Sequence, residues 1–172
     1  MLNPREFYMK GKAVMDCLIR PAVERDFDGL NALFEEIDEH HRKALPHIFR
    51  KPGGPARKRD LIMGILADKD AVIFIAEIQN QIVGLVHAFV RSYPEIPIRM
   101  PSRICEIDSL IVKDSYRRRG VGEALMKKVH QWAVQMRLER LELNVWDFNQ
   151  GAKDFYREID YKPAIIRMWK QL

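Results

Sequence analysis

The stretch from Arg117 to Gly122 constrains the fold most, because it joins a strand pattern directly to a helix pattern. The apolar run Ile104–Val112 precedes it, and apolar residues at helical spacing follow it as far as Met136. Three consecutive arginines therefore stand where a helix begins, at the positive end of its dipole, where acidic side chains are usual. A bound polyphosphate would remove this conflict by accepting hydrogen bonds from the free N–H groups of the first turn. The alternative is a solvated basic loop in front of a surface helix.

The glycines of this loop separate it from two other phosphate-binding motifs. A dinucleotide fingerprint needs a third glycine where this chain has Leu125, and a P-loop needs a Gly-Lys-Ser/Thr sequence that is absent. The remaining form, Arg/Gln-x-x-Gly-x-Gly after a strand, resembles the pyrophosphate-binding loop of the GNAT superfamily of N-acetyltransferases, which bind acetyl-CoA. The segment Asn149–Tyr156, followed by Tyr161, is similar to the family pattern Asn-x-x-Ala-x-x-Phe-Tyr, and Ile19–Ala22 resembles the family's first strand. The resemblance extends from about Cys17 to Leu172.

Alternating strand and helix patterns predict an α/β domain. We expect strands at 17–20, 71–78, 82–90, 103–112, 140–145 and 164–170, and helices from about 26 and at 58–67, 120–136 and 150–158. The prolines of Pro46–Pro55 and Arg91–Ser102 predict loops. The resemblance implies the acyl-CoA N-acyltransferase fold, a mixed, mostly antiparallel sheet flanked by helices, which splays in the middle where acetyl-CoA binds. Residues 1–15 are expected to form an N-terminal extension and residues 16–172 a single domain.

A net charge of +5 suits an anionic ligand such as acetyl-CoA, and would equally suit loose binding to nucleic acid. No apolar run is long enough to span a membrane, and neither the two cysteines nor the histidines show the spacing of a disulfide framework or a metal site. The resemblance implies that the protein binds acetyl-CoA and an amine. The bulk properties agree with this, and we expect a cytoplasmic protein without metal, membrane or nucleic acid, for which a homodimer stays open. Two alternatives are a non-catalytic acyl-CoA sensor and an acetyltransferase of aminoacyl-tRNA, the latter because Arg50-Lys51 and Arg57-Lys58-Arg59 form a basic patch.

Two carboxylates interrupt the apolar strand that precedes the loop. The two-residue period predicts that Glu106, Asp108, Leu110 and Val112 share one face and that Cys105 faces the other way. Because unpaired burial of a carboxylate is costly, they indicate either a wet cleft that receives a cationic amine or salt bridges to nearby arginines: Arg91, Arg99 or Arg103. An amine must lose its proton before it attacks a thioester. The resemblance implies that Glu106 is the catalytic base, while Asp108 or a chain of water molecules stays open as the base. If Glu106 is the base, we expect Asp108 to bind or orient the amine.

The resemblance also implies how acetyl-CoA is held. The backbone at the end of the strand pairs with the pantetheine arm, one amide polarises the thioester carbonyl, and the arginine–glycine loop holds the pyrophosphate. The implied cofactor-binding residues are Leu110, Ile111, Val112, Arg117, Arg118, Arg119, Gly120, Val121, Gly122, Glu123 and Asn149. Tyr156 is implied as the acid that protonates the departing thiolate, although a tyrosine at that helix position is ordinarily a core residue. Asn149 is equally a good helix N-cap.

The acceptor amine is the part that the sequence determines least. It would lie against the first helices and the two proline-containing loops, and it would take the acetyl group directly in a ternary complex, without an acyl-cysteine intermediate. The first predicted helix ends in a run of acidic residues: Glu35, Glu36, Asp38 and Glu39. They favour either a cationic amine or, more simply, a solvated helix face. Small amines, polyamines, aminoglycosides and protein N-termini all remain open, because the fold does not decide among them.

Overall fold

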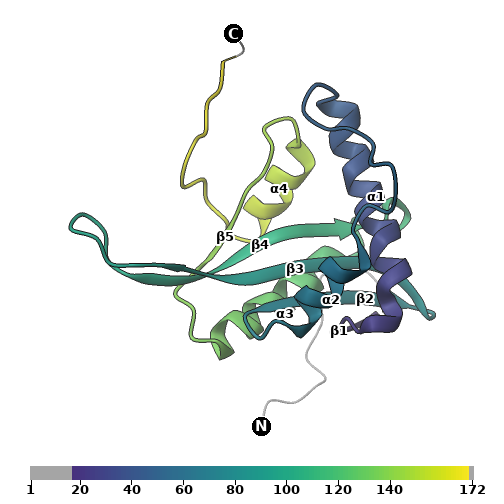
Figure 1. Cartoon of the computed structure of the whole chain (residues 1–172), viewed down its shortest axis with the longest axis horizontal. Coiled ribbons are helices and arrows are strands. Elements are labelled where there is room, and N and C mark those ends of the chain that lie inside the picture. Colours follow the sequence, from purple (N-terminus) through teal and green to yellow (C-terminus); the bar gives the residue numbers. More distant parts are fainter. Residues whose placement is uncertain (1–16, 171–172) are drawn as a thin grey trace.

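The computed structural model describes residues 17–170, so the expected N-terminal extension lies outside the described residues. Its centre is a sheet with the strand order β1-β2-β3-β4-β5 (Figure 1). The strands are β1 (Leu18–Pro21), β2 (Ala71–Ile78), β3 (Gln81–Tyr93), β4 (Ser102–Val112) and β5 (Leu141–Leu143). Neighbours from β1 to β4 are antiparallel, whereas β4 and β5 are parallel. The expected α/β fold with a mixed, mostly antiparallel sheet is confirmed.

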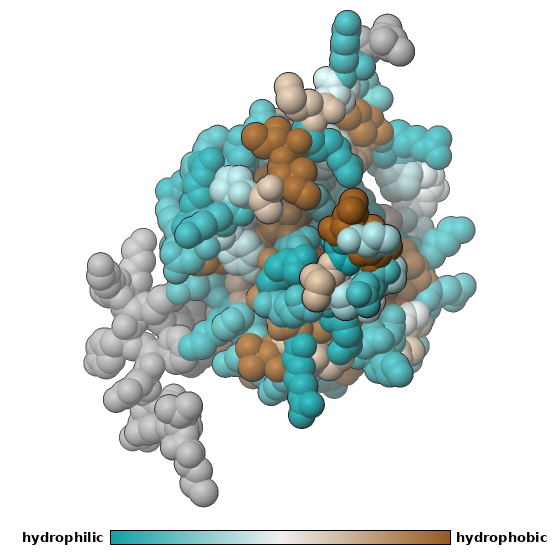
Figure 2. Space-filling view, turned by 90° about the vertical axis from the view of Figure 1, so that its left-hand side faces the viewer, coloured by the Kyte–Doolittle hydropathy of each residue, from teal (hydrophilic) through white to brown (hydrophobic). Residues whose placement is uncertain are grey.

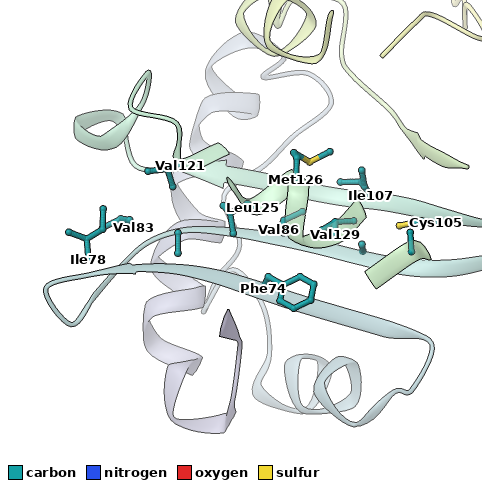
Figure 3. Packing of buried hydrophobic residues seen from close by; sticks show 13 residues of the cluster. Phe74, Ile78, Val83, Val86, Cys105, Ile107, Val121, Leu125, Met126 and Val129 are labelled. Atoms are coloured by element: carbon teal, nitrogen blue, oxygen red, sulfur yellow. The ribbon is translucent and has the colours of Figure 1, made fainter. Parts of the chain in front are cut away.

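Helices cover both faces of this sheet. They are α1 (Phe27–Ala44), α2 (Arg59–Ala67), α3 (Val121–Gln135) and α4 (Gln150–Glu158), with short 3-10 turns at Glu24–Asp26 and Asp114–Tyr116. The apolar stripe of α1 buries Leu30, Leu33 and Phe34 in one core, together with α2. On the other face, Leu125 and Val129 of α3 pack against β2, β3 and β4 (Figure 3). The two cores hold the sheet between helical layers, and the connection from β4 to α3 lies at one end of it.

The strands expected at 71–78 and 82–90 form a hairpin as β2 and β3, but β3 is longer than expected. Gln79 and Asn80 both have positive φ, 49° and 61°, which defines a two-residue turn that suits the twist of the strands. Beyond the expected end at Val90, β3 continues to pair with β4 as far as Tyr93 opposite Ser102. The two strands therefore project from the body as a narrow arm, visible at the left of Figure 1. The guanidinium of Arg99 lies 3.6 Å from the ring centre of Tyr93 and helps to hold the arm.

The prediction of a final strand at 164–170 is wrong for the single chain. These residues are extended but pair with no strand among residues 17–170. Their sequence has the composition of a strand, yet a strand forms only where a neighbouring edge supplies hydrogen-bond partners. The strand expected at 140–145 is also shorter, because pairing with β4 ends at Leu143.

Replacement of Arg137 by glycine should stabilise the protein. Arg137 ends α3 with φ 55°, and its N–H and that of Leu138 donate back to Val134 and Ala133 at 3.0 Å each. This is a C-terminal motif that prefers glycine. We expect Arg137→Gly to raise the free energy of unfolding by about 0.5–1 kcal/mol, because glycine removes the left-handed strain. Gln131→Gly, in the exposed interior of the same helix, should instead lower it by about 1 kcal/mol. Urea unfolding of both variants measures this, and equal signs would contradict it.

Candidate active site

A β-bulge in β4 changes the direction in which its side chains point. Ser109 lies opposite His87 and Ile107 lies opposite Ala88, so Asp108 is an extra residue without a partner on β3. Such a bulge shifts the two-residue alternation by one position. Cys105 and Ile107 therefore share the α3 side with Leu110 and Val112, all of which belong to or pack against that core. The predicted common face of Glu106, Asp108, Leu110 and Val112 is wrong for this reason.

The sheet opens between β4 and β5 immediately after this bulge. Parallel pairing covers only Cys105–Ile107 against Leu141–Leu143. The N–H of Cys105 donates to Arg140 at 2.9 Å on the β5 side, whereas that of Lys113 donates to Val83 at 2.9 Å on the β3 side. The N–H groups of successive residues in a strand point alternately to its two sides. Because that of Lys113 points to β3, those of Val112 and Leu110 point to the open edge. An extended ligand could therefore pair with the backbone there, as a strand would.

The arginine–glycine loop connects this open edge to the start of α3. Gly120 is the N-cap residue with φ 82°, and Arg118 also has positive φ, 57°. The first intrahelical bond runs from Ala124 N–H to Gly120 at 3.0 Å, so the N–H groups of Val121, Gly122 and Glu123 have no helical acceptor. Because Gly120 has no side chain to cap them, these donors are available to an anion.

The three arginines of the loop differ in their surroundings. Arg117 donates from Nε to the carbonyl of Val112 at 2.9 Å, pairs with Asp114, and lies 3.8 Å from a carboxylate oxygen of Glu36. Its side chain therefore closes the end of the open β4 edge. Arg118 is exposed, and the guanidinium of Arg119 lies 5.8 Å from the ring centre of Tyr116. The loop presents positive charge beside the first turn of α3.

The predicted residues of α4 lie next to that turn. A Cβ added at Gly122 would come within 3.3 Å of the Phe155 ring, so the start of α3 and α4 are in close contact. Asn149 accepts from the Ala152 N–H at 3.1 Å, which confirms that it is the helix N-cap. Tyr156 packs against the α3-side core, and burial raises the pKa of its phenol. A phenol already carries its proton near neutral pH, and the raised pKa makes that of Tyr156 harder to remove. Asp160 follows the C-cap of this helix in the left-handed conformation, with φ 68°.

Glu106 forms an ion pair with Arg91, one of the three arginines that the sequence offered as partners. Glu106 lies opposite Phe89 on β3, and only 17% of its side chain is exposed. The hydrogen bond to Glu106 raises the pKa of Arg91. Arg91 supplies the cationic partner of this largely buried carboxylate, so another cation could take the place of Arg91 beside it.

His87 was not singled out by the sequence analysis, yet it joins Asp108 at the bulge. His87 is buried, and its Nδ1 lies 3.2 Å from Oδ2 of Asp108. Ser109 Oγ donates to the same oxygen at 2.8 Å. The hydrogen bond from His87, followed by that from Ser109, holds the pKa of Asp108 below its usual range although 53% of that side chain is exposed. A lone histidine in the apolar run from Ile82 to Val90 was the available signal.

Rings from three segments meet beyond the end of β5. Phe49 lies 5.5 Å from Trp146 and 5.3 Å from His41, and Phe148 lies 5.6 Å from His40, all between ring centres. Burial and then the neighbouring His40 lower the pKa of His41. These rings connect the end of α1 to the segment between β5 and α4, on the side where the sheet opens.

Several charged side chains that the sequence indicated as possible binding sites for an amine or for nucleic acid form ion pairs within the chain. Arg57 forms a bidentate pair with Asp38 at 2.8 and 3.2 Å, and Arg59 pairs with Glu24 at 2.8 Å. Glu39 pairs with Arg42. Much of the acidic end of α1 and of the basic patch is therefore neutralised locally, as expected for a solvated helix face.

Two absences can be stated for residues 17–170. This part of the chain contains no cluster of histidine, cysteine, aspartate or glutamate side chains able to hold a metal ion. No described helix has the length and apolar character needed to cross a membrane.

A mixed sheet that opens between parallel strands, beside a glycine-containing loop at a helix N-terminus, is the arrangement of the acyl-CoA N-acyltransferase fold. The sequence model described as the acetyltransferase (GNAT) family matches residues 30–161. The chain belongs to this family, whose members use acetyl-CoA as co-substrate.

Comparison with individual proteins agrees with the family. The chain is 28% identical over 105 residues to the L-ornithine N5-acetyltransferase NATA1 of Arabidopsis thaliana, a match that covers 61% of this chain and 44% of that protein. It therefore spans less than half the length of this curated relative. A solved structure of a tetramutant of the BH1408 protein from Bacillus halodurans has a TM-score of 0.86 at 21% identity, covering 90% of this chain and 99% of that one. The aminoglycoside N-acetyltransferase AAC(6')-Iy in complex with CoA has a TM-score of 0.69 at 16% identity, covering 91% and 94%.

Proposed function

We propose that the chain transfers the acetyl group of acetyl-CoA to a primary amine by direct attack within a ternary complex. The observation that carries this proposal is the open edge of β4 over Asp108–Val112, which leads directly into the Arg117–Gly122 loop and the uncapped first turn of α3. The edge supplies backbone partners for the pantetheine arm, and the loop and helix supply donors for the pyrophosphate. Amine-dependent release of the CoA thiol tests the proposal.

The acceptor that we favour is a small basic amine. Asp108 presents a half-exposed carboxylate at the bulge, where it can bind an ammonium group. The name of NATA1 specifies ornithine, and that of AAC(6')-Iy an aminoglycoside, both of which carry several amines. Aminoacyl-tRNA is less favoured, because Arg57 and Arg59 of the basic patch are paired with carboxylates of the same chain. A protein N-terminus is the other acceptor that a screen should include.

Glu106 is proposed as the group that receives the proton of the amine. An arriving ammonium group can replace Arg91 beside Glu106, transfer one proton to the carboxylate and become the neutral nucleophile. The nitrogen then forms a bond to the acetyl carbon while the bond from that carbon to sulfur breaks. As the amide forms, the nitrogen releases its second proton to water, which balances the proton that the departing thiolate takes up. The Leu110 N–H, on the open edge after the bulge, is placed to stabilise negative charge that develops on the acetyl oxygen.

His87 and Asp108 provide a second candidate route for the proton. Their hydrogen bond of 3.2 Å fixes the imidazole through Nδ1 and leaves Nε2 to accept a proton directly or through water. This pair lies on the same face as Glu106, since His87 is opposite Ser109 and Phe89 is opposite Glu106. The ion pair between Glu106 and Arg91 favours this second route, because Arg91 already contacts the carboxylate that the first route requires as its base.

Tyr156 is proposed as the acid that protonates the departing thiolate. Tyr156→Phe keeps the ring and its packing and removes only the proton donor. We expect kcat to fall by about 10- to 1,000-fold, with acetyl-CoA affinity and stability nearly unchanged. Steady-state kinetics and calorimetry measure these quantities.

Tyr161→Phe is the matched control for Tyr156. The rings of Tyr156 and Tyr161 lie 5.5 Å apart, and burial raises the pKa of both phenols. Tyr161→Phe should keep the wild-type kcat. If Tyr156→Phe also keeps full kcat while chemistry is rate-limiting, Tyr156 is a core residue only.

A further inference from the structure

The guanidinium of Arg57, in the segment between α1 and α2, is fixed by its neighbours. It lies 4.7 Å from the ring centre of Phe34 on α1. Asp38 accepts from Nη1 at 2.8 Å and from Nη2 at 3.2 Å, and the carbonyl of Ala56 accepts from Nη1 at 2.8 Å. The backbone N–H of Arg57 donates to Oδ1 of Asn31 at 2.8 Å. A side chain that is already fixed loses little conformational freedom when a ligand binds to it.

One edge of this guanidinium has no partner among residues 17–170. A guanidinium carries five N–H groups, and two that lie side by side can form parallel hydrogen bonds with a carboxylate. Asp38 and Ala56 occupy both N–H groups of Nη1 and one of Nη2, so the Nε–H and the second N–H of Nη2 are free. The side chain is 30% exposed, so a ligand can reach it from solvent. The Nε–Nη2 edge therefore has the geometry and the charge to bind a carboxylate.

Asn31 adds an unpartnered donor at the same place. Only 9% of this residue is exposed, and its Nδ2 is buried without a hydrogen-bond partner among residues 17–170. A buried N–H group without an acceptor is costly and uncommon in native proteins. The oxygen of the same amide accepts from Arg57, so both sets of free donors lie where α1 meets the segment that follows it. A site that offers donors of this kind favours an anion.

This junction lies on the side of the sheet where the amine is proposed to bind. α1 packs against β3 and β4, and Leu85 belongs to the core beneath it. His87, two residues further along β3, therefore lies on the α1 side as well. Besides the hydrogen bond from His87, the positive charge of Arg57 lowers the pKa of Asp108. A cation and an anion are thus near each other at the bulge.

The surface around the arm suits a small charged ligand. Figure 2 looks at the molecule from the end of the arm, and most of this face is hydrophilic. The apolar side chains on it lie in several groups with hydrophilic side chains between them. Large contiguous apolar patches, by contrast, are typical of sites that bind other proteins. A small acceptor that is recognised through its charges agrees with this surface.

We propose that the Nε–Nη2 edge of Arg57 binds the carboxylate of the acceptor, and that the acceptor is an amino acid with a primary amine at the end of its side chain. This inference rests on the proposed function and narrows the small basic amines to one class. The carboxylate accepts two hydrogen bonds from Arg57, which stays paired with Asp38, while the side-chain amine reaches Asp108 and the proposed base. A polyamine or an aminoglycoside carries no carboxylate and leaves this edge of Arg57 without a partner.

Acceptors with and without a carboxylate test the inference. Putrescine and cadaverine are the decarboxylated forms of ornithine and lysine, and lysine amide carries a neutral amide in place of the carboxylate. For the better of the two amino acids, we expect kcat/KM of thiol release to be about 10- to 100-fold higher than for its decarboxylated form, because charge-assisted hydrogen bonds are lost. Lysine amide should react like cadaverine.

Arg57→Lys separates recognition from folding. Lysine keeps a positive charge near Asp38 and Asp108, but it has no edge with two parallel donors. The ratio of kcat/KM between the amino acid and its decarboxylated form should fall by about 10-fold or more, with the rate for the diamine little changed. Because both acceptors are measured on the same protein, partial unfolding would lower both rates and leave their ratio unchanged.

Two further variants complete the comparison. Asn31→Asp keeps an acceptor for the Arg57 N–H but puts negative charge where the unpartnered donor was, so it should also lower the ratio. Arg59→Lys is the matched control. Arg59 makes the same kinds of contact as Arg57, with the Phe27 ring centre of α1 at 5.0 Å and a Glu24 oxygen at 2.8 Å. It should keep the wild-type ratio.

The outcomes distinguish this inference from the proposed function. Equal efficiency with amino acids and diamines, or a ratio that Arg57→Lys leaves unchanged, overturns the inference while acetyl transfer stands. If no acceptor releases the thiol, the proposed function is wrong, and calorimetry of lysine and cadaverine with the CoA-bound protein then tests Arg57 directly. Binding of the amino acid alone, lost in Arg57→Lys, supports the carboxylate site, whereas equal binding of both or binding of neither overturns it.

Discussion

Gly120→Asp should abolish most of the affinity for acetyl-CoA while leaving the fold intact. Gly120 is the N-cap of α3 with φ 82°, directly before three N–H groups without helical acceptors. An aspartate there supplies its own carboxylate to these donors and repels the pyrophosphate. Loss of one or two charge-assisted hydrogen bonds, each contributing about 1.5–3 kcal/mol, corresponds to weakening of roughly 100-fold or more. Titration calorimetry with CoA measures it.

Gly120→Asn is the matched control for this experiment. Asparagine is close in size to aspartate and tolerates positive φ, but it is neutral. We expect its affinity to lie much nearer to that of the wild type, so that the difference between the two variants reports the charge. Wild-type affinity in Gly120→Asp would show that the first turn of α3 does not hold the pyrophosphate.

Glu106→Gln should lower kcat/KM by about 100-fold or more near neutral pH and by much less at high pH. The carboxamide cannot accept a proton, whereas at high pH the acceptor amine is already neutral without help. The measurement is a pH–rate profile of both proteins with one amine. Glu142→Gln is the control, because Glu142 lies opposite Glu106 on β5 and pairs with Arg140. It should leave the profile unchanged.

His87→Gln separates the two proposed routes for the proton. If Glu106 receives it, His87→Gln changes the rate by a pH-independent factor, through its contact with Asp108. If the His87–Asp108 pair receives it, His87→Gln acquires the steep pH dependence and Glu106→Gln does not. A profile of Glu106→Gln that matches the wild type at every pH excludes Glu106 as a base that affects the rate.

The sequence predicted the positions of the helices and strands better than it predicted how the strands pair and which way their side chains face. The Asn149 cap, the break between the strands expected at 71–78 and 82–90, and the helix after Gly120 depend on local chemistry, and the structure confirms them. The face of β4 was wrong because the extra residue at Asp108 exists only relative to the pairing with β3. For the same reason a two-residue period could not indicate that His87 contacts Asp108.

Local sequence patterns also did not predict where some of the strands end. The arm formed by β3 and β4 extends through Tyr93 because cross-strand pairing continues past the apolar run. The predicted strand at 164–170 has the right composition but no partner edge in its own chain. Prediction from a single sequence finds the segments that can pair, whereas the identity of the partner depends on tertiary or quaternary structure.

The central claim is that the opened edge of β4 and the Arg117–Gly122 loop serve acetyl transfer to an amine. Thiol release from acetyl-CoA, measured with ornithine, polyamines, an aminoglycoside and a peptide N-terminus, tests it most directly. We predict release above the hydrolytic background with at least one small basic amine, and initial-rate plots that intersect, as a ternary complex requires. Tight CoA binding without amine-dependent release from any of these acceptors would contradict the account and favour a sensor of acyl-CoA.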